Sequence, residues 1–137
     1  MNKNSNIGFV GLGNMGKPIF DNLNKEFSNV FCFDKDTSKL KINKFSSSLN
    51  EIFEKCKIII FCIESNEQII DIMKKNKIKK NTVIVDLTSS LPDLTKKISS
   101  YLKKFESHYI DAGMSGGASG ATNGTLTLML GGSKTIC

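Results

Sequence analysis

Near the amino terminus stands the decapeptide Ile7-Gly-Phe-Val-Gly-Leu-Gly-Asn-Met-Gly16, in which a short apolar run leads directly into a G-x-G-x-x-G pattern. Its first four residues are typical of a buried strand, and a helical pattern follows from Met15 to Asn24. A glycine pattern alone is a weak signal, but between a strand and a helix it predicts a turn that binds a dinucleotide phosphate.

The three glycines of this turn have different roles. Gly11 allows the tight turn, Gly13 lets the backbone approach a pyrophosphate, and Gly16 lets the helix pack against the strand. The free N–H groups and the positive end of the helix then favour an anion. The predicted turn comprises Gly11, Leu12, Gly13, Asn14, Met15 and Gly16. A glycine-rich turn without a ligand is the alternative interpretation.

An acidic residue stands where a dinucleotide fold needs one. The second candidate strand, Val30 to Phe33, ends at Asp34, about 20 residues beyond the glycine turn. A carboxylate there accepts hydrogen bonds from the adenosine ribose hydroxyls and repels a 2′-phosphate. We therefore expect NAD as the cofactor, with NADP disfavoured. Lys35 is the neighbouring positive charge that would weaken this preference, and a solvated turn acid is the alternative role for Asp34.

Short apolar runs alternate with helical patterns along the chain, which predicts an α/β fold with a Rossmann-type doubly wound parallel sheet. Expected strands are Ile7 to Val10, Val30 to Phe33, Ile58 to Ile63, Val83 to Asp86 and His108 to Ile110, with a weak one near Ile42 to Phe45 and a last run at Leu126 to Leu130. Expected helices are Met15 to Asn24, Leu49 to Lys55, Glu67 to Lys75 and Pro92 to Phe105. The small residues from Ala112 to Thr125 are typical of a flexible loop or linker.

Length and composition exclude several classes of protein. With 137 residues and 39% hydrophobic content, the chain is long enough for one domain with a core and too short for two. No run approaches the roughly 18 apolar residues of a membrane span, and no secretory leader is recognisable. We expect a cytoplasmic protein without a membrane partner.

The net charge of +6 does not indicate a nucleic-acid partner, because all 19 basic residues are lysines. Without arginine the chain has no guanidinium groups for bidentate contacts to bases or phosphates. The four cysteines show no C-x-x-C spacing, so we expect reduced thiols and no metal site.

Three ordered segments resemble the β-hydroxyacid dehydrogenases, a family that includes 3-hydroxyisobutyrate and 6-phosphogluconate dehydrogenases. They are Gly8-Phe-Val-Gly-Leu-Gly-Asn-Met-Gly16-Lys-Pro-Ile, Asp86-Leu-Thr-Ser-Ser-Leu-Pro92 and Asp111-Ala-Gly-Met-Ser-Gly-Gly-Ala-Ser-Gly-Ala, followed by a strand-like segment from Gly124 to Gly132. The resemblance covers essentially the whole chain. It implies an oxidoreductase that transfers hydride between a small 3-hydroxyacid and NAD, with 6-phosphogluconate as an alternative substrate.

The resemblance also implies roles for particular residues. Cofactor contacts fall on Ile63, Glu64 and Gln68, and the contact to the nicotinamide ribose falls on Ser89. Glu64 stands where the family has proline, and Ser89 keeps the hydroxyl of the family's threonine. A strand-end acid and a helix-capping serine are their alternative roles. Substrate contacts fall on Ser115 and on the backbone of Gly116 and Gly117, where bare N–H groups can face an anion.

In the family the general acid/base is a lysine on a G-x-x-G-x-G-x-x-x-K-like pattern in a following helical domain, and no such pattern occurs up to Cys137. We therefore expect residues 1–137 to be a single, incomplete NAD(P)-binding domain that has no catalytic residue and is inactive alone. A homo-oligomer is expected only with the helical domain present. Lys17 and His108 are poor substitutes for the lysine. A non-catalytic dinucleotide-binding module and a degenerate remnant are the alternatives.

Overall fold

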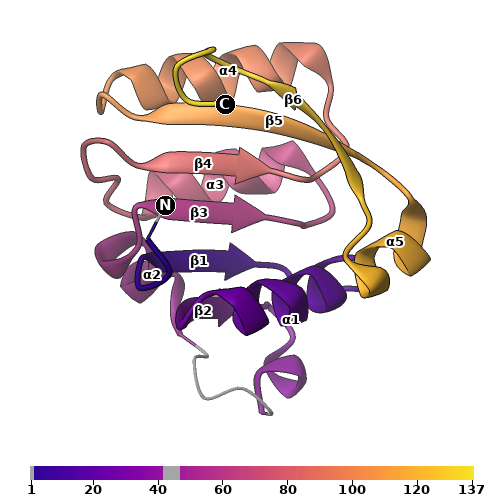
Figure 1. Cartoon of the computed structure of the whole chain (residues 1–137). Helices are drawn as coiled ribbons and strands as arrows, with labels where there is room; N and C mark the ends of the chain where they lie inside the picture. The colour runs from indigo at the N-terminus through magenta and orange to yellow at the C-terminus, as the bar shows by residue number, and fades with distance from the viewer. Residues whose placement is uncertain (1, 42–46) are drawn as a thin grey trace.

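The computed structural model describes residues 2–41 and 47–137, and these form one six-stranded sheet with helices on both faces (Figure 1). The strands are β1 (Asn6–Val10), β2 (Asn29–Phe33), β3 (Ile58–Phe61), β4 (Val83–Asp86), β5 (His108–Ser115) and β6 (Thr127–Gly131). The helices are α1 (Gly16–Glu26), the 3-10 helix η1 (Thr37–Leu40), α2 (Leu49–Lys55), α3 (Asn66–Lys75), α4 (Pro92–Lys103) and α5 (Gly117–Asn123). The expected strand near Ile42 to Phe45 lies outside the described residues, apart from which every expected strand and helix is present.

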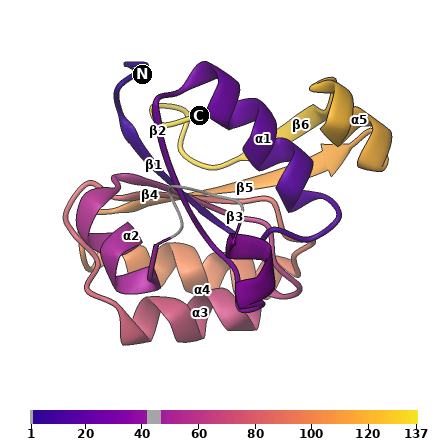
Figure 2. The ribbon, with the colours of Figure 1, turned by 90° about the horizontal axis from the view of Figure 1, so that it is seen from below.

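The sheet has the order β2-β1-β3-β4-β5-β6. Its first five strands are parallel, as expected, with α1 on one face and α2, α3 and α4 on the other (Figure 2). The parallel arrangement does not extend to β6, which pairs antiparallel with β5. A parallel return needs a crossover of a dozen or more residues, usually with a helix across the sheet. The connection through α5 is too short for that, so the chain reverses.

The expectation of a flexible loop from Ala112 to Thr125 is also wrong. The first part of this segment extends β5, and the second part forms α5, which packs against α1 (Figure 2). The Asn22 side chain of α1 donates hydrogen bonds to the Ala121 carbonyl at 2.8 Å and the Thr122 carbonyl at 3.3 Å. Gly124 ends the helix in the left-handed conformation, with φ of 68°. Small residues here permit close packing of two helices.

Two apolar layers hold the helices against the sheet. One lies under α2, α3 and α4 and includes Ile59, Ile69 and Ile98, while the other lies under α1. In this second layer the rings of Phe9 and Phe20 meet edge to face with centroids 6.0 Å apart. Strands buried on both faces explain the continuous apolar runs in the sequence. No helix in the described ranges is long and apolar enough to cross a membrane.

Candidate functional site

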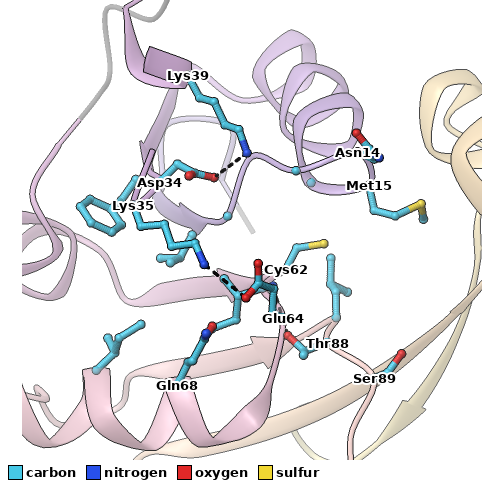
Figure 3. Close-up of a pocket in the computed structure, with 18 of the residues that line it drawn as sticks. Asn14, Met15, Asp34, Lys35, Lys39, Cys62, Glu64, Gln68, Thr88 and Ser89 are labelled. Carbon is cyan, nitrogen blue, oxygen red and sulfur yellow. Dashed lines mark hydrogen bonds and ion pairs between the residues drawn. The ribbon is translucent and has the colours of Figure 1, made fainter. Parts of the chain in front are cut away.

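A cavity of about 660 Å³ lies at the carboxyl ends of the parallel strands. It opens where the chain order reverses between β1 and β3, the position at which doubly wound sheets bind ligands. Its volume is in the range of small-molecule sites. Eleven of the predicted cofactor residues line it: Gly11, Gly13, Asn14, Met15, Gly16, Asp34, Lys35, Ile63, Glu64, Gln68 and Ser89 (Figure 3). The remaining predicted residue, Leu12, is not among the lining residues, and its side chain is buried in the core beneath α1.

Two glycines of the turn are in close contact with backbone atoms of the protein, and the third faces open space. Gly11 has a φ of +102°, and a Cβ there would lie 2.2 Å from the Cys62 carbonyl oxygen. A Cβ on Gly16 would lie 2.0 Å from the Gly11 carbonyl oxygen. A Cβ on Gly13, in contrast, would meet no atom of the described residues within 4 Å. Folding therefore explains two of the glycines, whereas the third leaves room for a ligand to approach the backbone.

The amino-terminal end of α1 lies beside this turn. In the part of the chain that the structure describes, no side chain caps the start of this helix. Its positive end is therefore available to an anion at the cavity. This arrangement fits the pyrophosphate of a dinucleotide.

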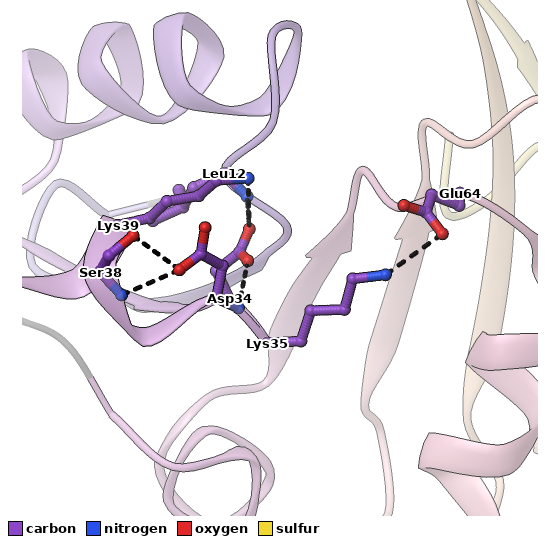
Figure 4. Close-up of polar contacts among 7 residues, drawn as sticks. Leu12, Asp34, Lys35, Ser38, Lys39 and Glu64 are labelled. Atoms are coloured by element: carbon purple, nitrogen blue, oxygen red, sulfur yellow. Dashed lines mark hydrogen bonds and ion pairs between the residues drawn. The ribbon is translucent and has the colours of Figure 1, made fainter.

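Asp34 anchors the opposite side of the turn. Asp34 is 6% exposed, and one of its carboxylate oxygens accepts a hydrogen bond from the Leu12 N–H at 2.6 Å (Figure 4). The other oxygen accepts from the Asp36 N–H at 2.8 Å. An ionised carboxylate has about four acceptor sites, so two remain for ribose hydroxyls.

Two lysines flank this carboxylate. Lys35 pairs with Glu64 at 3.2 Å across the cavity (Figure 3), and the Lys39 Nζ lies 3.9 Å from Asp34. Sequence reasoning misses Lys39, because only the position of η1 brings this residue to the cavity. A local signal for η1 itself exists in the sequence, since Asp36 caps this helix by accepting hydrogen bonds from the backbone N–H and the hydroxyl of Ser38.

A buried polar network fixes the loop after β4. Asp86 is fully buried and accepts hydrogen bonds from the Asn66 amide, the Tyr109 hydroxyl and the Thr88 N–H. Burial raises the pKa of the Asp86 carboxyl, against the lowering effect of these donors. Thr88 in turn accepts from the Ile63 N–H at 3.3 Å. The network therefore ties the loop that carries Thr88 and Ser89 to the ends of three strands, which sequence reasoning did not foresee.

Cys62 also lines the cavity, beside the glycine turn. Burial raises the pKa of its thiol to about 11. The thiol is thus neutral at physiological pH and is a poor nucleophile. It acts here as a small packing group.

The predicted substrate segment lies apart from this cavity. Ser115, Gly116 and Gly117 are exposed at the end of β5 and are not among the lining residues, although Met114 just before them is. Gly116 has a φ of +126° and turns the chain into α5. Their role in substrate binding stays a prediction.

The fold and this cavity define the class of the protein as a dinucleotide-binding Rossmann domain. Residues 6–137 match the family model of the NAD binding domain of 6-phosphogluconate dehydrogenase. The chain therefore belongs to this family of NAD-binding domains. The sequence resemblance to the β-hydroxyacid dehydrogenases is confirmed by this match and by the curated relatives.

Among these relatives, 2-(hydroxymethyl)glutarate dehydrogenase of Eubacterium barkeri is 34% identical over 99% of this chain and 48% of its own length. Mitochondrial 3-hydroxyisobutyrate dehydrogenase of Mus musculus is 31% identical over 92% of this chain and 41% of its own. The chain thus spans less than half of the length of either relative. The expected cytoplasmic location stays a prediction.

Solved structures support the fold. Mycobacterium tuberculosis 3-hydroxyisobutyrate dehydrogenase, solved with L-serine, has a TM-score of 0.89 at 23% identity, over 96% of this chain and 48% of that one. Psf3 in complex with NADP⁺ and 2-OPP has a TM-score of 0.84 at 20% identity, over 95% of this chain and 50% of that one.

Proposed function

We propose that this chain binds NAD in preference to NADP and is the cofactor-binding part of an oxidoreductase for a small 3-hydroxyacid. The observation that carries the proposal is that one cavity holds the glycine turn and, hydrogen-bonded to it, the buried Asp34 carboxylate. The names of the curated relatives, which include hydroxyacid dehydrogenases, support the substrate class.

Each part of the cavity has a proposed task. The backbone from Gly11 to Gly16 and the start of α1 hold the pyrophosphate, and Asp34 accepts hydrogen bonds from the adenosine ribose. Ile63 and Gln68 contact the cofactor from the far wall, and the Ser89 hydroxyl contacts the nicotinamide ribose. A bound nicotinamide supplies the hydride chemistry.

We propose that Ser115, Gly116 and Gly117 bind the hydroxyacid and that proton transfer needs a residue outside these 137. Within residues 2–41 and 47–137, the lysines that line the cavity are Lys35 and Lys39. Both follow β2, whereas Ser89 follows β4, and β1 and β3 lie between these strands. No cavity lysine of the described chain is therefore placed for acid/base chemistry beside the nicotinamide. A helical domain beyond this one would supply that group and an oligomer interface.

Calorimetric titration with NAD and NADP tests the cofactor assignment. We expect tighter binding of NAD, and a reduced preference in Asp34→Asn, because the amide no longer repels a 2′-phosphate. Equal or tighter binding of NADP by the unmodified chain would contradict the proposal. Turnover of 3-hydroxyisobutyrate or 6-phosphogluconate by this chain alone would contradict the claim that it is catalytically incomplete.

A further inference from the structure

The ion pair between Lys35 and Glu64 joins two strand ends across the mouth of the cavity. Lys35 follows β2, Glu64 follows β3, and β1 with its glycine turn lies between these strands. Figure 4 shows the pair itself. The two side chains are 72% and 74% exposed, and their Nζ–Oε2 distance is 3.2 Å. Such an exposed pair contributes little to folding and is screened by salt. Because both residues line the cavity, however, the pair can affect which ligand binds there.

Five charged side chains of the described residues line the cavity: Asp34, Lys35, Lys39, Glu64 and Asp71. Both lysines already have acidic partners, since Lys39 approaches Asp34 at 3.9 Å and Lys35 pairs with Glu64. A lysine ammonium is a compact charge that binds phosphate well when it is available. In this arrangement the acids of the cavity compete with a phosphate for both lysines.

We propose that Glu64 is a specificity-determining residue that disfavours NADP. This inference rests on the proposed cofactor site, in which the adenosine ribose lies against Asp34, next to Lys35. A 2′-phosphate on that ribose would carry about two negative charges at pH 7. Glu64 acts against it in two ways, because it engages Lys35 and adds a negative charge nearby. NAD has no phosphate at this position, so Glu64 changes the ratio of the two affinities.

The test is the ratio of the dissociation constants of NADP and NAD, measured by calorimetry for the full chain and for Glu64→Gln. We expect this ratio to fall about three- to fivefold in the variant at low salt, and less at high salt. Adding Lys35→Gln to Glu64→Gln should restore the ratio part of the way toward that of the unmodified chain, because one of the two effects depends on the released lysine. Both side chains are largely exposed, so the variants should fold, which circular dichroism verifies.

Glu106→Gln is the matched control. Glu106 pairs with Lys80 at 2.8 Å, and these side chains are 68% and 64% exposed, but neither lines the cavity. This variant should leave the ratio unchanged. A ratio that Glu64→Gln does not lower, or that Glu106→Gln lowers equally, overturns the inference and leaves the NAD site standing. Failure of the unmodified chain to bind NAD overturns the proposed function, and the inference with it.

Discussion

Replacing Gly13 by alanine separates the binding role of the glycine turn from its folding role. A Cβ at this position meets no atom of the described residues within 4 Å, and Gly13 is not among the glycines with positive φ. The methyl group therefore enters open space at the cavity wall. Since alanine also restricts the unfolded chain, we expect the free energy of unfolding to stay constant or to rise by about 0.4–1 kcal/mol.

The neighbouring glycines give the opposite expectation and serve as controls. A Cβ on Gly11 would lie 2.2 Å from a backbone oxygen, at a φ of +102°, and one on Gly16 would lie 2.0 Å from another. Overpacking or strain of this kind costs about 1–3 kcal/mol. That is a large part of the roughly 5–15 kcal/mol that stabilises a typical domain.

Urea denaturation and calorimetric titration with NAD measure the two roles separately. In Gly13→Ala we expect the affinity for NAD to fall at least about tenfold, or roughly 1.4 kcal/mol, because the methyl group keeps the pyrophosphate from the backbone N–H groups. The urea midpoint should not fall. Unchanged NAD affinity in Gly13→Ala, or a loss of stability comparable to that of Gly16→Ala, would refute the reasoning.

Two further predictions concern buried groups near the cavity. Because burial raises the pKa of Asp86 above the value of about 3.9 in an unfolded chain, the native state binds this proton more tightly. The free energy of unfolding should therefore decline as the pH rises from the unfolded-state pKa to the native-state pKa of Asp86, and the Asp86→Asn variant should lack this decline. Urea titrations at several pH values measure it, and equal pH dependence in the variant and the unmodified chain would contradict the prediction. Burial raises the pKa of Cys62 to about 11, so iodoacetamide at neutral pH should label the exposed Cys137 and spare Cys62, as peptide mapping can show.

The parts of the fold that the sequence could predict are those encoded by local patterns. The helix from Pro92 is an example, because proline and Asp93 stand in its first turn and Ile98 and Leu102 form its buried face. The direction of β6 could not be read in this way. It follows from the short connection through α5, whose small residues show no local helical pattern and which packs against α1 at Asn22, far away in the chain.

The same distinction applies to the site. The glycine turn and Asp34 are recognisable because their spacing is set by one strand-helix-strand unit. The network around Asp86 is not recognisable, because its donors come from α3, the loop after β4, and β5. Only the folded sheet brings these residues together. Lys39 is intermediate, since the capping signal of its short helix is local but its approach to the cavity is not.

Asp34 and Glu64 differ in how far their effects on cofactor choice can be separated from folding. The Asp34 carboxylate accepts hydrogen bonds from the Leu12 and Asp36 N–H groups, so it orients the glycine turn as well as the proposed ribose site. The two N–H groups use opposite carboxylate oxygens, and an asparagine has an NH₂ group in place of one of them, which cannot accept a hydrogen bond. Changes at Asp34 will therefore alter the affinity for both cofactors. Glu64 is largely exposed and pairs with the Lys35 side chain, so its charge can be removed without disturbing the turn. Substitutions designed to change the cofactor preference of this domain should consequently replace Glu64 first and keep Asp34.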